Sequence, residues 1–235
     1  MRLKLIACEV LYREICEAAA RSVNQVDIEF LPKGLHDQGS RRMRAALQER
    51  VDAAEPGPHE RLLFGYGLCG NGLTGLEARS RPLVIPRAHD CITLFLGSRE
   101  RYQDYFEQHP GVYFLTSGWI ERGRNLESQL SLSFADLAVR YGEEDARYLQ
   151  QELTKHYRQF TYIEMGVEPD DRFERCTQEE AASRGWAYEK VRGDLSLIRR
   201  LVDGPWDAPR FLTVLPGQRV AAAHDGTVLG VEEVR

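Results

Sequence analysis

The chain lacks the features that mark membrane, secreted and nucleic-acid-binding proteins. Among its 235 residues, no apolar run approaches the ~20 residues that a membrane-spanning helix needs. The first apolar run stops at Glu9, too early for the hydrophobic part of a secretory signal. A formal net charge of -5 provides no general attraction for nucleic acid or an anionic membrane surface. We therefore expect a soluble, cytoplasmic protein that binds neither nucleic acid nor a membrane.

Cysteine is also scarce, and its spacing is informative. The chain has five cysteines and no Cys-x-x-Cys pair, so it matches no compact zinc-finger pattern. In a chain with no export signal, five cysteines suit reduced thiols better than a disulfide framework. The thiols are then available for metal binding or for chemistry.

The first half of the chain alternates short apolar runs with helical patterns. We predict strands at residues 3–7, 26–31, 61–66, 82–85 and 112–115, and helices at 10–22, 41–54 and 90–107. Such alternation implies right-handed crossovers and a parallel sheet that is covered on both faces. The expected fold class is α/β, with a doubly wound, mainly parallel, Rossmann-like sheet.

The second half is more polar, and its elements are harder to delimit. We predict a helical region at 126–157, strands at 160–165, 186–191 and 211–215, helices at 179–184 and 195–202, and a closing hairpin around residues 225–226. Residues 1–125 then form a Rossmann-like region that carries the functional site. Residues 126–235 form a second α/β region that packs on it, either as part of one continuous domain or as a second lobe.

Soft metal ligands follow several of the predicted strands. Cys8 ends the first strand, His36 lies after the second, Cys69 follows the third, and His89 and Cys91 follow the fourth. Ligands of open parallel sheets bind beyond the carboxyl ends of the strands, so these side chains should gather at one edge. Thiolate and imidazole groups bind zinc and other thiophilic metals. We predict a metal site made by the three cysteines with one of the two histidines.

The glycine-rich segment 65–72 follows the third strand and loosely resembles a dinucleotide-binding motif. No acidic residue ends a following strand about 20 residues later, and the lysine of a P-loop is absent. Glycines after a strand permit close backbone approach and unusual dihedral angles. We therefore predict that Gly67, Gly70 and Asn71 bind the cofactor, and that the glycines let Cys69 and Asn71 approach a metal or a small substrate.

Charged residues beside the cysteines are the candidate catalytic groups. The Arg87 guanidinium can clamp a carboxylate or phosphate, and Asp90 can orient an imidazole or cap the helix that follows. Glu9, next to Cys8, and Glu164, at the end of a predicted strand, are candidate acid/base groups.

Other residues have a structural interpretation beside the functional one. Three aromatic residues, Tyr66, Tyr102 and Trp119, either line the site or belong to the core, because aromatic side chains do both. Cys16 and Cys176 are predicted to be buried small hydrophobes, since unmodified cysteine is among the most buried residue types.

Several segments along most of the chain carry a family resemblance: residues 7–8, 34–36, 66–72, 86–92, 97–102, 117–120 and 205–217. They are similar to the bacterial and archaeal domain-of-unknown-function family 1638. This resemblance implies no defined activity. It implies an association of some members with corrinoid-dependent methyltransferase systems, and hence a corrinoid protein or a methyltransferase as a partner.

Three functions remain open at this point. The leading hypothesis is a zinc enzyme that acts on a small anionic or thiol substrate, with methyl transfer as the reaction if the corrinoid link applies. The second is a binding protein that holds an iron-sulfur cluster or carries a metal to a methyltransferase. The third is a metal-free enzyme in which Cys69 is the nucleophile and His89 the base, which requires a lowered thiol pKa.

Overall fold

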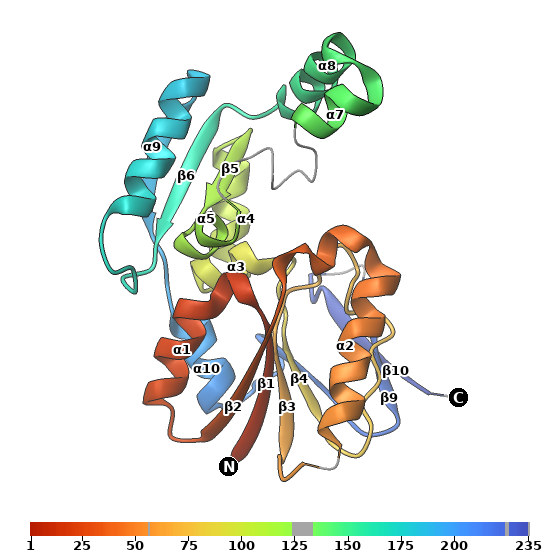
Figure 1. Ribbon diagram of the computed structural model, residues 1–235. Helices are drawn as coiled ribbons and strands as arrows, with labels where there is room; N and C mark the ends of the chain where they lie inside the picture. Colours follow the sequence, from red (N-terminus) through yellow and green to blue (C-terminus); the bar gives the residue numbers. More distant parts are fainter. Residues whose placement is uncertain (56, 124–133, 224–225, 235) are drawn as a thin grey trace. The chain divides into compact units, whose positions relative to one another are not determined.

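The computed structural model describes residues 1–235 except 56, 124–133, 224–225 and 235, and except the side chains of residues 36, 37, 135, 136 and 150 (Figure 1). Two compact units divide the chain. The first unit contains Met1–Gln103 and Gly193–Arg235, and the second contains Asp104–Arg192. The boundary predicted near residue 125 falls in the segment 124–133, outside the described residues.

The first unit is built on a five-stranded sheet. Its strands are β1 (Arg2–Cys8), β2 (Gln25–Leu31), β3 (Arg61–Gly65), β4 (Leu83–Pro86) and β8 (Phe211–Val214). They lie in the order β2-β1-β3-β4-β8. The first four are parallel, and β8 pairs with β4 in the antiparallel sense. The expected mixed α/β fold with a mainly parallel sheet is confirmed.

Helices cover both faces of this sheet, which explains why its inner strands are apolar on both sides. In β1, Leu3, Leu5 and Ile6 are all fully buried. The covering elements are the 3-10 helix η1 (Glu9–Leu11), α1 (Tyr12–Arg21), η2 (Lys33–Gln38), α2 (Ser40–Ala54) and α10 (Ser196–Asp203). Helices α1 and α10 pack together on one side, and α2 lies on the other (Figure 1). The helix that follows β1 and the helix that follows β2 thus lie on opposite faces of the sheet.

Two short helices and a hairpin complete the surroundings of β4. Helix α3 (Cys91–Leu96) follows β4, and α4 (Arg99–Gln108) begins in the first unit. Strands β9 (Gln218–Ala222) and β10 (Leu229–Glu233) pair as an antiparallel hairpin, which confirms the hairpin predicted at the C-terminal end. The turn residues 224–225 lie outside the described residues.

The second unit has its own parallel sheet, in the order β5-β6-β7. Its elements are β5 (Val112–Leu115), α5 (Ser117–Arg122), α7 (Phe134–Tyr141), α8 (Glu143–Thr154), β6 (Gln159–Glu164), α9 (Arg172–Arg184) and β7 (Ala187–Arg192). A separate core lies around Phe160, Tyr162 and Phe173. The strand predicted at 112–115 in the first, Rossmann-like region thus pairs in a second sheet as β5.

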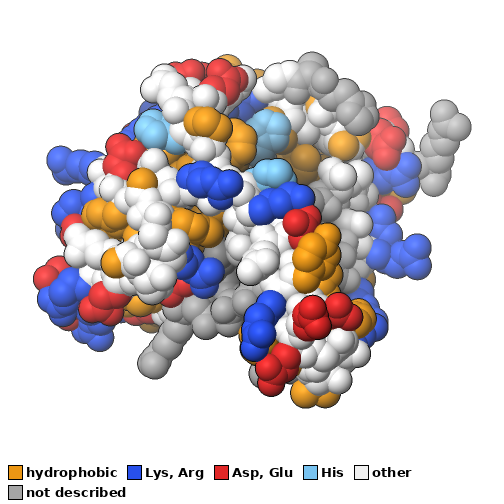
Figure 2. All heavy atoms as spheres, turned by 90° about the horizontal axis from the view of Figure 1, so that it is seen from above, with side chains coloured by type: hydrophobic (Ala, Val, Ile, Leu, Met, Phe, Trp, Pro, Cys, Tyr) orange, Lys and Arg blue, Asp and Glu red, His pale blue; other side chains and the backbone are white. Residues whose placement is uncertain are grey.

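The helices and the drawn surface give no sign of a membrane span or of one dominant charge. No helix in the described part of the chain combines the length and apolar character that crossing a bilayer requires. On the face shown in Figure 2, lysine and arginine side chains are interspersed with aspartate and glutamate. This mixture agrees with the modest net charge of -5.

Candidate functional site

Three neighbouring strands of the first unit end at the same edge of the sheet, and backbone hydrogen bonds join the loops that follow two of them. The parallel strands β1, β3 and β4 are adjacent, so their carboxyl ends meet. Beyond the strands, the amide of Leu68 donates to the Ala88 carbonyl at 2.8 Å and that of Cys69 to the His89 carbonyl at 2.9 Å. We name the group that results the strand-end site; its members are Cys8, Tyr66, Cys69, Asp90 and Tyr102.

The strand-end site contains two thiols with strongly perturbed acidity. Burial raises the pKa of Cys8 to about 11. Burial, followed by the charges of Asp90 and Cys8, raises the pKa of Cys69 to about 12. Cys8 is 8% exposed and Cys69 is partly exposed. Since the charge on one thiol acts on the other, the two lie in a shared environment, and both are protonated near neutral pH in the metal-free chain.

A buried tyrosine hydroxyl lies in the same environment. Tyr66 is 3% exposed, and its hydroxyl has no hydrogen-bond partner among the described residues. Burial raises the pKa of Tyr66, and the charges of Cys8 and Cys69 raise it further. Leaving such a donor unsatisfied costs about 1–3 kcal/mol. The hydroxyl is therefore an unsatisfied donor in the environment of the two thiols.

The backbone around Cys69 is strained. Cys69, Gly70 and Asn71 have consecutive left-handed φ angles of 44°, 64° and 66°. For the two residues with a side chain, this conformation costs roughly 1–2 kcal/mol each. The turn closes where the Gly72 amide donates to the Leu68 carbonyl at 3.0 Å. Strain of this kind is concentrated at functional sites in proteins, which supports a functional role for the loop.

Gly67 is needed for a close approach between two loops. A Cβ atom on this residue would lie 2.7 Å from the backbone nitrogen and Cα of Asp90. Any side chain there would push the loop after β3 away from the loop after β4. The structure therefore gives Gly67 a packing role, whereas Gly70 has open space around it. Ligand contact by Gly67, Gly70 and Asn71 stays a prediction.

Asp90 caps helix α3, one of the two roles predicted for it. Its Oδ1 accepts hydrogen bonds from the amides of Ile92 at 3.0 Å and Thr93 at 3.3 Å. The Tyr102 hydroxyl donates to the other carboxylate oxygen at 3.2 Å. Burial raises the pKa of Asp90, and these hydrogen bonds oppose the rise. Tyr102 thus belongs to the site as a partner of Asp90.

Arg87 binds backbone carbonyl groups within the first unit. Its Nε donates to the Ala208 carbonyl at 2.7 Å, and its Nη1 donates to Thr227 at 3.0 Å and to Leu229. These bonds tie the loop after β4 to the segment before β8 and to the β9-β10 hairpin. They fix the guanidinium in place, and its use as an anion clamp stays a prediction.

Glu9 organises the loop that follows β2. Its Oε1 accepts a hydrogen bond from the Lys33 amide at 3.0 Å. The Lys33 charge also acts on Cys8, where it lowers the pKa against the larger effect of burial. The sequence analysis missed Lys33, although it lies after a strand that ends at this edge. Lysine is not a soft metal ligand, so the pattern of thiol and imidazole groups at strand ends does not include it.

The remaining predicted ligands are less closely associated. His89 is exposed and Cys91 is partly exposed at the first position of α3, while the side chain of His36 lies outside the described residues. Within the described residues, no three His, Cys, Asp or Glu side chains form a group that could hold a metal ion. The donor chemistry suits zinc at Cys8 and Cys69, but a complete ligand set is not assembled among these residues.

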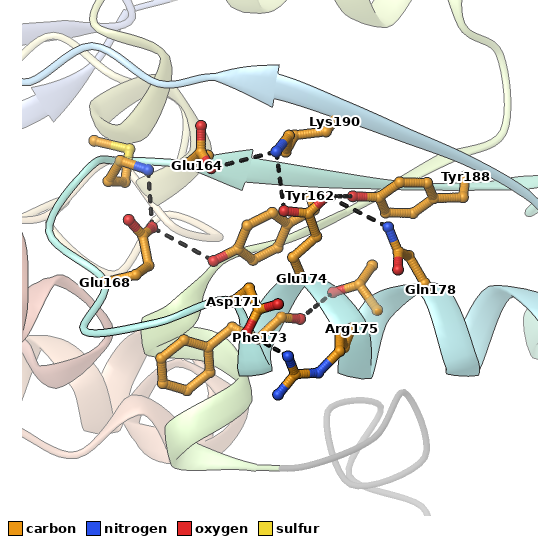
Figure 3. Close-up of polar contacts among 12 residues, drawn as sticks. Tyr162, Glu164, Glu168, Asp171, Phe173, Glu174, Arg175, Gln178, Tyr188 and Lys190 are labelled. Carbon is orange, nitrogen blue, oxygen red and sulfur yellow. Dashed lines mark hydrogen bonds and ion pairs between the residues drawn. The ribbon is translucent and has the colours of Figure 1, made fainter.

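Glu164, the other candidate acid/base group, belongs to the second unit. It ends β6 and contacts Lys190, whose Nζ lies 3.4 Å from Glu164 Oε1 and 2.9 Å from Glu174 Oε2 (Figure 3). The Tyr188 hydroxyl donates to Glu174 at 3.1 Å. Burial and this hydrogen bond raise the pKa of Tyr188 to about 12. The carboxylates here are bound to cationic or hydroxyl groups, as expected of a structural network between β6, β7 and α9.

The fold and the site define a mixed α/β protein with a thiol-bearing site at the ends of parallel strands. The chain belongs to the family described as Protein of unknown function (DUF1638), which it matches over residues 30–202. Cys69, His89 and Cys91 lie within the matched range, and Cys8 precedes it. No curated protein and no solved structure matches the chain.

Proposed function

We propose that this chain binds a thiophilic metal ion, zinc in the first place, at the strand-end site and acts there on a small anionic or thiol substrate. The observation that carries this proposal is the shared environment of two thiols, the buried Cys8 and the partly exposed Cys69, with the Tyr66 hydroxyl. Bound zinc would stabilise a thiolate or polarise a substrate oxygen. Further ligands would come from Cys91, His89 or His36.

The raised pKa values of Cys8 and Cys69 favour this proposal over a metal-free cysteine nucleophile. A nucleophilic cysteine needs a lowered pKa, but the pKa of Cys69 is raised to about 12. A metal ion would displace the thiol protons, so binding would release protons and weaken as the pH falls. The iron-sulfur and metal-carrier alternatives use the same thiols. The metal content of the purified protein distinguishes an iron-sulfur cluster from zinc.

The order of the strands supports a finer interpretation of the fold. We propose that the first unit is Rossmann-like and doubly wound, with the two units as two lobes. From β1 the chain runs to β2 on one side and then crosses back over β1 to β3 on the other side. This reversal creates a switch point between β1 and β3. Ligands of such sheets bind in the crevice beyond this point. Cys8 and Cys69 follow these two strands.

We also propose a compartment and a partner for this protein. None of the five cysteines, all of them among the described residues, forms a disulfide, which supports work in a reducing compartment such as the cytoplasm. A corrinoid protein or a methyltransferase is the partner implied by the family resemblance. With such a partner, methyl transfer to a zinc-activated thiol is the most concrete reaction.

The test is the metal and acid-labile sulfide content of anaerobically purified protein. We would compare the wild type with Cys8→Ser and Cys69→Ser, and use Cys176→Ser, which alters a thiol of the second unit, as the control. We expect about one zinc per chain in the wild type and the control, and little in the two site variants. Iron with sulfide would indicate the cluster alternative.

Two results would contradict the metal proposal. One is protein that stays metal-free after equilibration with zinc. The other is zinc content that is equal in all four proteins, since the metal would then be bound elsewhere. Circular dichroism spectra of the variants would show that each retains its fold.

A further inference from the structure

The first unit contains a cavity of about 350 Å³ beside the end of β4. Its lining shares no residue with the strand-end site. Three arginines, Arg87, Arg99 and Arg210, line it together with the first residues of α4 and α10. A volume of this order is within the range of pockets that hold small molecules.

Neutral groups hold two of these arginines in position. Arg87 donates to backbone carbonyls, as described above, and Arg99 donates to the carbonyls of Gly226 and Pro209, the latter at 3.4 Å. Carbonyl oxygens carry only partial charge, so the bonds to Gly226 and Pro209 leave the Arg99 guanidinium cationic. The ion pair of Arg99 with Glu100 is long, at 3.7 Å, and the Glu100 side chain is 74% exposed. Solvent therefore screens this pair strongly.

The starts of two helices border the same cavity. Ser98 caps α4, where its Oγ accepts from the Arg101 amide at 3.0 Å. Asp194 accepts from the Ser196 amide at 2.7 Å at the start of α10, and its own amide donates to the Phe95 carbonyl at 2.9 Å. Helix N-termini carry partial positive charge, which the Asp194 carboxylate partly offsets at the start of α10.

Two carboxylates, Asp194 and Glu100, also line the cavity. Arg210 pairs with Asp207 at 2.9 Å, and Asp194 serves the start of α10. The cavity thus combines fixed guanidinium groups with two helix starts. Planar guanidinium groups match the geometry of carboxylate and phosphate oxygens.

We propose that this cavity binds the oxyanion group, phosphate or carboxylate, of a small molecule. Arg87 and Arg99 supply the charge, and the carbonyls that hold them fix their orientation before the ligand arrives. Such preorganisation lowers the entropy lost on binding. The site needs neither thiols nor metal, so it stands apart from the proposed function.

The test is a titration of the intact protein with inorganic phosphate and, separately, with succinate, at constant ionic strength. Isothermal calorimetry would be run on the wild type, Arg99→Gln and Arg101→Gln. The control Arg101→Gln removes a charge from the same helix at a residue that does not line the cavity. We expect phosphate or succinate to bind the wild type, with affinity lowered about tenfold in Arg99→Gln and little changed in Arg101→Gln.

The two ligands distinguish the sources of the oxyanion. Binding of phosphate alone indicates a phosphorylated molecule, and binding of succinate alone indicates a carboxylate. Absence of binding by both, or an equal loss in both arginine variants, would overturn the proposal. The same titration of Cys69→Ser should match the wild type, so that failure of the metal proposal leaves this result unaffected.

Discussion

A cysteine thiol ordinarily ionises near pH 9, and the strand-end site moves Cys8 and Cys69 well above that value. The apolar strand ends remove water from the thiols, and nearby negative charges disfavour the further negative charge of a thiolate. The hydrogen bonds from the backbone around them act in the opposite direction and are too weak to prevail. Acidity at this site is thus decided by burial, a property of position in the fold.

The raised pKa of Cys8 should make stability fall in alkaline solution. Between the ordinary value of 9.0 and a folded pKa of about 11, the unfolded chain loses the thiol proton first. The folded state then binds more protons, so its stability is complete below about pH 9 and is lost as the pH rises through the folded value. Chelator-treated protein should lose roughly 2–3 kcal/mol from this source.

Urea unfolding at about pH 8 and about pH 11 would measure the effect. In Cys8→Ser, which cannot ionise there, the loss of unfolding free energy should be smaller by that amount. Identical losses in the variant and the wild type would show that the thiol is not desolvated in the folded state.

Gly67 gives a second test at the residue scale. Because a Cβ atom would lie 2.7 Å from the Asp90 backbone, Gly67→Ala should lower the free energy of unfolding by about 1–3 kcal/mol. The matched control is Gly230→Ala in β10, where the Cβ would meet nothing within 4 Å. Urea midpoints would compare the two. Equal stability of both variants would mean that the two loops do not approach as closely as described.

At the scale of elements, helix α3 depends on its first residue. The helix has only six residues, and the Asp90 carboxylate satisfies two of its free amides. Its C-terminal end is set by Gly97, whose φ of 81° suits glycine. Asp90 therefore has a structural role that must be separated from any role in chemistry.

Two substitutions can separate these roles. Asp90→Ala should cost about 1 kcal/mol of stability, because it removes the cap, whereas Asp90→Asn should cost little, because asparagine caps as well as aspartate. Thermal unfolding would measure both. A loss of zinc or ligand binding in the stable Asp90→Asn variant would assign the charge a functional role, and equal destabilisation by both changes would contradict the capping role.

At the scale of the whole molecule, two separate cores predict two unfolding events. Trp206 belongs to the first unit, where its Nε1 donates to the Leu201 carbonyl at 2.8 Å. Trp119 and Trp186 belong to the second, where Trp186 lies 4.8 Å from Phe160 between ring centroids. Each unit therefore has its own fluorescent probe.

Fluorescence-monitored urea unfolding would use Trp206→Phe and the double variant Trp119→Phe/Trp186→Phe. The two probes should give different midpoints, because each unit buries its own apolar side chains. Circular dichroism of each variant controls for damage by the substitutions. Coincident midpoints would show that the units unfold as one cooperative structure.

Local sequence patterns predicted most elements of this molecule. The strand predicted at 112–115 has the bounds of β5. The bounds predicted for β1, β3 and β4 lie within one or two residues of the observed ones. The predicted helix 90–107 is in fact divided at Gly97 and Ser98 into α3 and α4, and α9 begins earlier than the predicted residue 179. Such boundaries depend on caps and packing more than on apolar periodicity.

The sequence by itself determined the succession of strands and helices and the edge at which Cys8, Cys69 and Asp90 meet. Both follow from local periodicity and from the rule that parallel strands end together. Only the tertiary structure decided that β5 joins a second sheet and that Arg87 binds carbonyls far along the chain. It also decided that the Tyr66 hydroxyl is buried without a partner in the described residues. Strand pairing, burial and distant hydrogen bonds arise between residues far apart in sequence, and a local pattern does not encode them.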